Sequence, residues 1–221
     1  MLREVDIKEI SDGRLYGVND MVKADCGGCA GCSVCCRGMG ESIVLDPFDV
    51  YRITTGLSVT FDDLLREKLA LRVVDGLILP YVRMTGKDEA CVFLNEESRC
   101  GIHALRPGVC RLFPLGRIYE EDGFHYFLQA GECVNPNRTK VKVKKWIDTP
   151  EPKRYEQYIK DWHFLLKELR ELLDAGGDWE QRRKVSMLLL QTFFVRLYER
   201  ESDFYGQFEA RKESFKSFII F

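Results

Sequence analysis

The feature that most constrains this chain is a run of cysteines from Cys26 to Cys36, which reads CGGCAGCSVCC. Five of the nine cysteines fall within these eleven residues, and most of the residues between them are small. Thiolates packed so closely repel one another unless a cation balances their charge, and small residues let backbone N–H groups turn toward the sulfurs. The run therefore predicts a metal centre. Folding could bring to it the four later cysteines, Cys91, Cys100, Cys110 and Cys133.

The composition describes a globular protein that does not depend on disulfide bonds. The chain has 221 residues, 45% of them hydrophobic, which is enough to bury a core. A net charge of -2 does not indicate nucleic acid or an anionic membrane as a partner. The charged start, MLREVDIKEI, is unlike a secretory signal, and no run approaches the roughly 20 apolar residues that span a bilayer. We therefore expect a cytoplasmic protein, where clustered cysteines more often bind metal than form disulfides.

Two ligand spacings are embedded in the run. From Cys26 to Cys36 the chain has the C-x2-C-x2-C-x3-C spacing of bacterial ferredoxins, although Arg37 stands where those proteins have proline and there is no second copy. From Cys29 to Cys36 it has C-x2-C-x2-C-C, which leaves Cys26 outside. The spacing within the run leaves both interpretations open.

The later cysteines lie in an unusual sequence. Cys91 precedes Val-Phe-Leu, Cys100 precedes Gly-Ile-His, and the segment from Arg106 to Pro114 reads RPGVCRLFP. With a C-x2-C-x2-C-C opening and a last cysteine, these pieces resemble the CxxCxxCC cysteine-cluster family, also called YkgJ-like, which is described as a zinc- or iron-chelating domain and as an iron–sulfur cluster protein. The resemblance covers residues 26–133. The ligand set that it implies is Cys29, Cys32, Cys35, Cys36, Cys91, Cys100, Cys110 and Cys133.

The number of thiols leaves the kind of metal centre open. Eight thiolates could fill two tetrahedral sites, or four could hold one cluster. In an extended segment the adjacent Cys35 and Cys36 would point to opposite sides and serve different metal atoms or sites. A zinc ribbon does not need this doublet, so we expect an iron–sulfur cluster of the 4Fe-4S type, with zinc as the alternative. Cys26 is predicted to be dispensable, and we assign His103 to packing or hydrogen bonding rather than to ligation.

Three arginines lie next to cysteines in the sequence. Arg37 follows the run, and Arg106 and Arg111 flank Cys110. A thiolate centre carries net negative charge, which guanidinium groups could offset while tuning the potential of a cluster. Arg37, Arg106 and Arg111 are therefore predicted to contact the cofactor. The alternative for each is an ordinary arginine at the surface or paired with a carboxylate.

Turn and capping signals divide the rest of the first 145 residues into short elements. Asp46-Pro47 supplies a helix N-cap followed by proline, and Thr60 with Asp63 resembles a capping box. Asp-Gly pairs favour tight hairpin turns. The predicted elements are a hairpin within residues 1–25, a strand at 42–45, a helix from Pro47 to Thr55, a helix from Thr60 with Leu69 on its apolar face, hairpins at 73–79 and 117–129, and an edge strand at 140–145.

The last third of the chain has a helical period. One apolar stripe runs from Tyr155 to Leu173, Gly176-Gly177 ends it, and Asp178 can cap a second helix that packs antiparallel to the first. Aromatic residues in 204–221 mark a shorter last helix. We therefore predict an α+β fold, in which a cysteine-rich metal-binding domain of short hairpins and helices over residues 1–145 is followed by a helical extension over 146–221.

Two classes of function follow from these features. The first is a redox or cluster-dependent protein such as an oxidoreductase, which the thiols and neighbouring arginines favour. Flagellin lysine N-methylases contain a similar cysteine domain, so protein-lysine methyl transfer is a further alternative, although no glycine-rich loop after a strand indicates S-adenosylmethionine binding. The second class is a non-catalytic zinc-binding module whose helical extension docks a protein partner. We expect neither nucleic acid nor a membrane as a partner.

Overall fold

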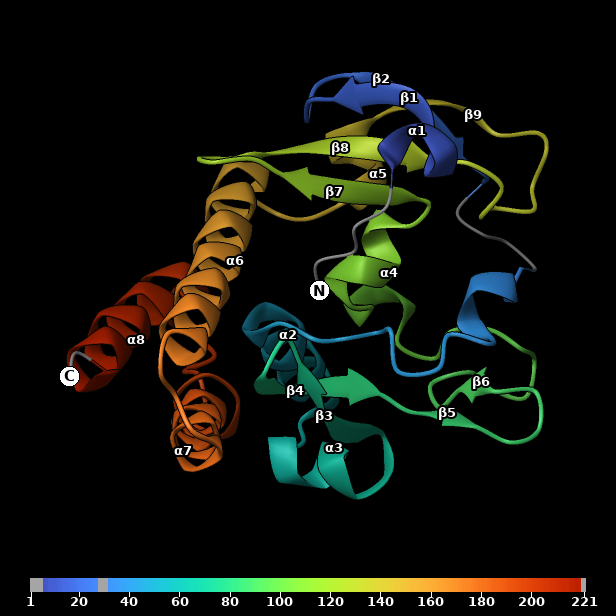
Figure 1. The fold of residues 1–221 in the computed structure, drawn as a ribbon. Helices are drawn as coiled ribbons and strands as arrows, with labels where there is room; N and C mark the ends of the chain where they lie inside the picture. The colour runs from blue at the N-terminus through green and yellow to red at the C-terminus, as the bar shows by residue number, and fades with distance from the viewer. Residues whose placement is uncertain (1–5, 28–31, 220–221) are drawn as a thin grey trace.

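Small antiparallel sheets form the β part of the computed structural model, which describes residues 6–27 and 32–219. Within these residues one sheet has three strands, in the order β1-β8-β7, and the other strands form two-stranded pairs. Helices pack around the strands, and the last three helices, α6 to α8, lie together at one side of the molecule (Figure 1). The predicted α+β class with a helical C-terminal region is confirmed.

The hairpin predicted within residues 1–25 is wrong. β1 (Ser11–Tyr16) and β2 (Met21–Asp25) are joined by a turn, in which the Asp20 N–H donates to the Gly17 carbonyl at 3.1 Å, but the two strands do not pair with each other. β1 pairs with β8 (Phe124–Gln129), and β2 pairs with β9 (Thr139–Lys142). Each strand therefore has a partner far along the chain.

The burial of β2 explains its choice of partner. Val22 and Ala24 are buried, and β2 packs against α5 (Val143–Ile147), which directly follows β9. The edge strand predicted at 140–145 is consequently only half correct, because the chain becomes helical after Lys142. The residues that α5 buries are Val143, Trp146 and Ile147.

Two capped helices follow the cysteine run, as predicted. α2 (Pro47–Leu57) and α3 (Phe61–Glu67) both begin with a capping box. In each, the N-cap side chain accepts a hydrogen bond from the backbone N–H of an aspartate three residues on, and the side chain of that aspartate accepts one from the N-cap backbone N–H. α2 continues through Gly56 to Leu57, and its C-cap, Ser58, has a left-handed φ of 55°. Leu69 begins a strand rather than extending α3, and it is buried there.

The two predicted Asp-Gly hairpins are confirmed. β3 (Leu69–Val74) pairs with β4 (Leu77–Val82) through a turn in which Asp75 and Gly76 have positive φ angles of 49° and 83°. β7 (Leu115–Tyr119) pairs with β8 in the same antiparallel manner. The strand predicted at 42–45 is reduced to one bridge between Val44 and Tyr81, beside β4.

The C-terminal part contains three helices, α6 (Pro152–Asp174), α7 (Trp179–Leu190) and α8 (Phe204–Ile219). Asp178 caps α7 with a capping box, and a turn of π-helix at Gln191–Val195 follows it. The antiparallel packing predicted for the first two is wrong, because α7 is seen nearly end-on in Figure 1 while α6 lies across the view. α7 packs instead against β4. Among the described residues, no helix is both long and apolar enough to cross a bilayer.

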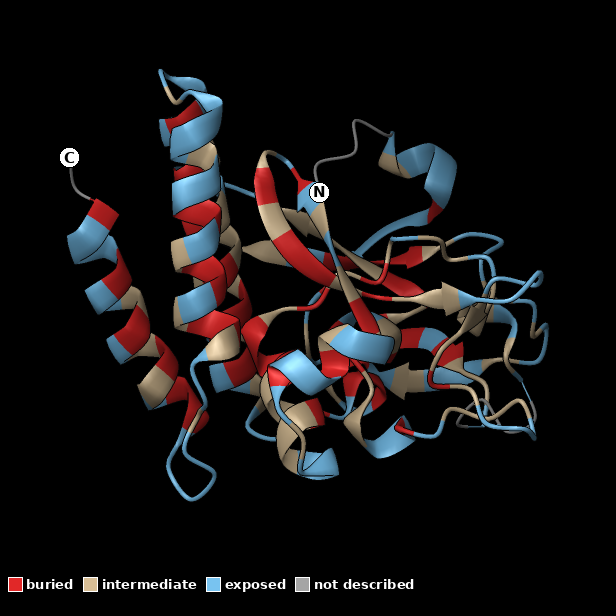
Figure 2. Ribbon diagram, turned by 90° about the horizontal axis from the view of Figure 1, so that it is seen from below, coloured by how far each residue is buried: buried red, intermediate tan, exposed pale blue. Residues whose placement is uncertain are grey.

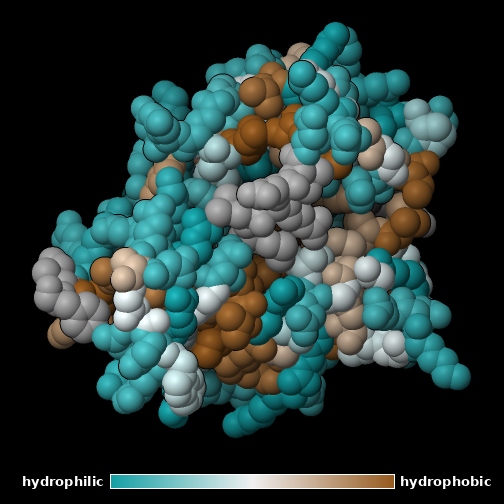
Figure 3. Space-filling view, in the orientation of Figure 1, coloured by the Kyte–Doolittle hydropathy of each residue, from teal (hydrophilic) through white to brown (hydrophobic). Residues whose placement is uncertain are grey.

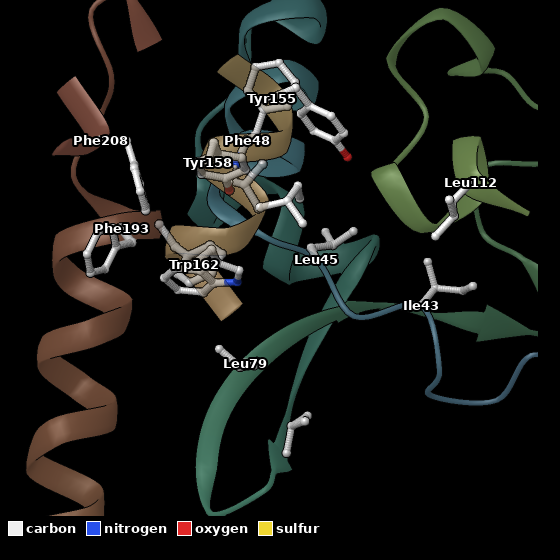
Figure 4. Packing of buried hydrophobic residues seen from close by; sticks show 14 of the residues in the cluster. Ile43, Leu45, Phe48, Leu79, Leu112, Tyr155, Tyr158, Trp162, Phe193 and Phe208 are labelled. Atoms are coloured by element: carbon white, nitrogen blue, oxygen red, sulfur yellow. Dashed lines mark hydrogen bonds between the residues drawn. The ribbon is translucent and has the colours of Figure 1, made fainter. Parts of the chain in front are cut away.

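These helices share their core with the first part of the chain. Buried residues form stripes along the helices (Figure 2). The rings of Tyr155 and Tyr158 of α6 lie beside that of Phe48 of α2, while Trp162 of α6 packs on Phe193 (Figure 4). The ring of Phe48 lies 4.9 Å from that of Phe204, between centroids. A single cluster of buried residues therefore runs from β1 to α8.

The outer surface is mainly hydrophilic on the face shown in Figure 3. A hydrophobic patch lies below its centre, over the region where Figure 1 places α2 and the β3–β4 hairpin. Exposed apolar residues of these elements include Leu57, Leu71 and Val73. The remaining short elements are α1 (Ile7–Ile10), the 3-10 turn η1 (Val34–Cys36), β5 (Met84–Thr85), β6 (Ala90–Cys91), the 3-10 turn η2 (His103–Leu105) and α4 (Gly108–Leu112).

Candidate metal centre

The cysteines of the described chain lie on several short elements. η1 holds Cys35 and Cys36, β6 ends at Cys91, and α4 holds Cys110. Cys100 forms an isolated bridge with Leu94. η1 is attached to β6 by a bridge between Arg37 and Ala90 and by the Gly38 N–H, which donates to the Glu89 carbonyl at 3.0 Å. Long-range backbone pairing thus brings the end of η1, with Cys35 and Cys36, toward Cys91. The predicted ligand Cys29 lies outside the described residues.

Cys91 and Cys100 have the same local structure. The Cys91 carbonyl accepts a hydrogen bond from the Leu94 N–H at 2.9 Å, and the Cys100 carbonyl accepts one from the His103 N–H at 3.2 Å. Burial raises the pKa of both thiols, and the backbone N–H two residues on, that of Phe93 for Cys91 and of Ile102 for Cys100, works to lower it. An N–H donor stabilises the thiolate form, which is the form that binds metal. These two turns are therefore suited to present metal ligands.

Four thiols from four segments lie close enough to influence one another. Burial raises the pKa of the Cys110 thiol most, and the charges of Asp49, Cys91, Cys35 and Cys100 raise it further. Burial likewise raises the pKa values of Cys91 and Cys100, and Cys35 contributes to both increases. The fold thus places a cysteine of the N-terminal run within electrostatic range of three of the later group. We call Cys35, Cys91, Cys100 and Cys110 the cysteine quartet.

Cys35 and Cys36 do not point to opposite sides of an extended segment. They lie in the 3-10 turn η1, where a hydrogen bond between their side chains, more than burial, raises the pKa of Cys35. The extended segment on which that expectation was based is therefore wrong, and the assignment of Cys35 and Cys36 to different metal atoms or sites stays a prediction.

Three other described cysteines lie in or next to loops. Cys32 is exposed, Cys133 is in the loop between β8 and β9, and Cys26 directly follows β2. Among the described residues, no group of three or more His, Cys, Asp or Glu side chains has the arrangement of a formed metal site. The donors of the quartet nevertheless fit zinc or iron chemically, because thiolate sulfur is a preferred ligand of both Zn2+ and iron–sulfur clusters.

The three predicted cofactor arginines have different surroundings. The positive charge of Arg106 partly offsets the increase in the pKa of Cys35 and of Cys100. Its Nη1 atom lies 3.1 Å from Nε2 of His103. Arg37 donates to Oγ of Ser98 at 3.2 Å. The Arg111 guanidinium is buried and donates to main-chain carbonyl oxygens, including those of Arg106, Ala104 and Asp148. Of these three arginines, Arg106 is thus the one whose charge acts on thiols of the quartet, and Arg99 acts on Cys100 as well.

Partial burial, followed by the charges of Arg106, Arg99 and Arg111, lowers the pKa of His103. Its imidazole is therefore neutral at pH 7 and lies next to Arg106. The sequence-based assignment of His103 to hydrogen bonding rather than ligation is consistent with this contact.

Two residues beside Cys110 were missed by sequence reasoning. The buried carboxylate of Asp49 accepts a hydrogen bond from the Gly108 N–H at 2.6 Å, and the hydroxyl of Tyr155 on α6 reaches the same glycine. Asp49 was recognisable only as a residue of the first turn of a helix, and Tyr155 only as part of an apolar stripe. No sequence pattern connects either of them with Cys110.

Comparison with known proteins agrees with the cysteine pattern. The model of the CxxCxxCC family, described as "Putative zinc- or iron-chelating domain", matches residues 28–144. No match is found among the curated proteins or among the solved structures. The matched region is more than half of the chain and contains the cysteine quartet, η1 and the two similar turns at Cys91 and Cys100. The chain therefore belongs to the CxxCxxCC family of zinc- or iron-chelating domains.

Proposed function

We propose that this chain carries an iron–sulfur cluster of the 4Fe-4S type, bound by thiolates of its cysteine cluster. The observation that carries the proposal is the gathering of the cysteine quartet from four separate segments. Four cysteine thiolates are the usual ligand set of such a cluster. The remaining predicted ligands would complete this centre or form a second one. They are Cys29, Cys32, Cys36 and Cys133.

The surroundings of the quartet support a negatively charged centre. The amides of Phe93 and Ile102 donate to two of the sulfurs, and the guanidinium of Arg106 lies near Cys35 and Cys100. Hydrogen bonds to sulfur and nearby positive charge are two of the ways in which a protein sets a cluster's potential. A bound cluster would supply one-electron transfer. We therefore propose a redox or cluster-dependent role, in a reducing compartment such as the cytoplasm, where thiols persist.

Zinc is the second candidate, and a specific observation favours it. The equivalent turns at Cys91 and Cys100 each present one sulfur with an amide donor, and two further thiols would complete a tetrahedral site of four cysteines. In that case the centre would be structural. It would hold together a region whose elements within residues 84–112 are too short to be stable alone.

Anaerobic purification followed by analysis of metal and acid-labile sulfide separates these proposals. We expect a brown protein with about four iron and four sulfide per chain, which is the composition of a 4Fe-4S cluster. A colourless protein with stoichiometric zinc and no sulfide would replace the first proposal by the second. A chain that retains neither metal after reconstitution with iron and sulfide or with zinc would contradict both.

Serine substitutions test which thiols bind the metal. Replacement of Cys35, Cys91, Cys100 or Cys110 should remove most of the bound metal, because the serine hydroxyl is not ionised at neutral pH and is a poor ligand for soft metals. Cys26→Ser is the matched control, since the sequence predicts that this thiol is dispensable. The measurement is metal per chain with the melting temperature of each variant. Loss of metal in Cys26→Ser, with retention in Cys110→Ser, would exclude the quartet as the ligand set.

A further inference from the structure

The helix that presents Cys110 starts at a glycine enclosed by two other elements. Gly108 is the first residue of α4 and is buried. Its N–H donates to Oδ1 of Asp49, on α2, at 2.6 Å. A Cβ atom at this position would lie 2.6 Å from the hydroxyl oxygen of Tyr155, on α6, and 3.5 Å from Oδ1 of Asp49. Real Cβ atoms do not approach oxygen at 2.6 Å, so only glycine fits beneath Tyr155 without displacement.

Neither Asp49 nor Tyr155 can move away easily. Asp49 is 4% exposed, and its other carboxylate oxygen accepts the Asp46 N–H at 3.2 Å in the capping box of α2. Tyr155 is 2% exposed, and its ring centroid lies 5.7 Å from that of Phe48. Its hydroxyl accepts a bond from NH2 of Arg117 at 3.4 Å. The start of α4 is therefore held between two packed and hydrogen-bonded side chains.

We propose that Asp49 and Tyr155 are positioning residues for Cys110, fixing the first turn of α4 and hence the direction in which its sulfur points. This inference rests on the proposed function, since it requires that Cys110 binds the metal. Tyr155 lies beyond the matched residues 28–144, so the C-terminal helices take part in forming the centre. The sulfur of a ligand is useful only if its backbone holds it in the geometry that the metal requires.

A compensating pair of substitutions tests the contact with Tyr155. Gly108→Ala should weaken metal binding about 10-fold to 100-fold, the usual effect of disturbing a group that supports a ligand. Tyr155→Phe removes the oxygen that the new methyl group would meet, so Gly108→Ala combined with Tyr155→Phe should recover most of the lost affinity. The readout is retention of the metal that the wild-type chain carries as purified, in competition with a chelator of known affinity.

Tyr158→Phe is the matched control for this rescue. Tyr158 lies on the same helix and is equally buried, but its hydroxyl accepts the Phe48 N–H at 2.9 Å and does not appear among the atoms that a Cβ at Gly108 would meet. Combined with Gly108→Ala, it should leave the metal affinity low. Wild-type affinity in Gly108→Ala, or equal rescue by either phenylalanine, would overturn the proposed role of Tyr155.

The role of Asp49 is tested by conservative and non-conservative variants. Asp49→Asn keeps an oxygen that can accept the Gly108 N–H, so its metal affinity should stay within about threefold of wild type. Asp49→Ala should lower the metal affinity about 10-fold or more. Asp63→Ala is the control, because Asp63 has the same place in the capping box of the exposed helix α3. Equal metal retention in Asp49→Ala and Asp63→Ala would overturn the role of Asp49. A wild-type chain without metal would overturn the proposed function and this inference together.

Discussion

Buried arginines show how single side chains stabilise this molecule. Arg111 is 5% exposed and uses its guanidinium to join carbonyl oxygens of Arg106, Ala104 and Ile147. Burial, with the nearby charges of Arg52 and Arg106, lowers its pKa to about 10, so it remains charged at neutral pH. One planar group with several donors can satisfy carbonyls from η2, from α5 and from Arg106 at the end of η2 at once, which the compact ammonium of lysine cannot do.

Arg111→Lys should therefore lower the free energy of unfolding by about 2 kcal/mol, since several hydrogen bonds of a charged donor would be lost or distorted. Metal content should stay at the wild-type level. Urea denaturation and metal analysis of the same preparations measure both quantities. Arg66→Lys is a suitable control, because Arg66 is mostly exposed and forms only a surface pair with Asp63. Loss of metal without loss of stability would instead support the cofactor contact that the sequence predicts for Arg111.

The burial of His163 makes the stability of the folded chain decrease at acid pH. Its ring stacks on Tyr119 with 3.5 Å between centroids, and burial, aided by Lys167 and Arg170, lowers its pKa to about 4. In the unfolded chain the pKa of histidine is about 6.5. Between these values the unfolded chain binds a proton that the folded chain does not, so this contribution is fully present above pH 6.5 and is lost as the pH falls toward 4.

His163→Phe should reduce that dependence, because phenylalanine preserves an aromatic contact with Tyr119 but cannot be protonated. The comparison is the urea midpoint of each protein at pH 7.5 and pH 5. We expect the wild-type midpoint to fall more than that of the variant over this interval. An imidazole resonance of His163 that titrates near its ordinary pKa of about 6.5 would contradict this prediction.

At the scale of elements, features set by a few neighbouring residues were predictable from sequence. The capping box of Thr60 and Asp63 and the turn at Asp75-Gly76 depend only on residues within four positions of each other. The choice of partner for each strand does not depend on nearby residues alone. β1 and β2 are close in sequence and joined by a turn, yet each pairs with a strand near the other end of the matched region, because buried contacts decide between possible partners.

The turn of the β3–β4 hairpin offers a test at this scale. Gly76 has a φ of +83°, and a Cβ there would lie 2.6 Å from NH1 of Arg182, on α7. Gly76→Ala should lower the free energy of unfolding by about 1–2 kcal/mol, the cost of a left-handed residue with a Cβ, in addition to any displacement of Arg182. Thermal or urea unfolding measures the change.

Gly123, in the turn of the β7–β8 hairpin, provides the comparison for this prediction. It does not have a left-handed φ, and a Cβ would meet no other atom within 4 Å. Gly123→Ala should therefore change stability by no more than about 0.5 kcal/mol. Equal effects of the two substitutions would show that neither the backbone conformation nor the contact with α7 governs the Gly76 position.

At the scale of the whole molecule, the candidate metal ligands can be recognised from the sequence, whereas the residues that position those ligands cannot. Thiol-rich spacing and the later cysteine motifs reveal their chemistry directly. The support of Cys110 by Asp49 and Tyr155 depends on packing between α2, α4 and α6, which lie far apart in sequence. Nothing in the type or spacing of those two residues distinguishes them from an ordinary helix cap and an ordinary core tyrosine.

The predicted boundary near residue 145 leads to a test with a shortened chain. A chain ending at Thr149 keeps α5 but exposes Phe48 and the face of β4 that α7 covers. Because one buried cluster joins these parts, we expect the shortened chain to aggregate or to lose its cooperative unfolding transition. Size-exclusion chromatography and calorimetry measure this. A soluble monomer with a cooperative transition and full metal content would support an independent domain over residues 1–145.

The pairing of β2 with β9 closes residues 26–138 into a loop whose ends lie side by side, since Asp25 and Thr139 face each other across the ladder. All nine cysteines lie within that loop. Moving the two ends of this cysteine-bearing segment apart would therefore require β2 and β9 to separate, beginning at the pair of Asp25 and Thr139.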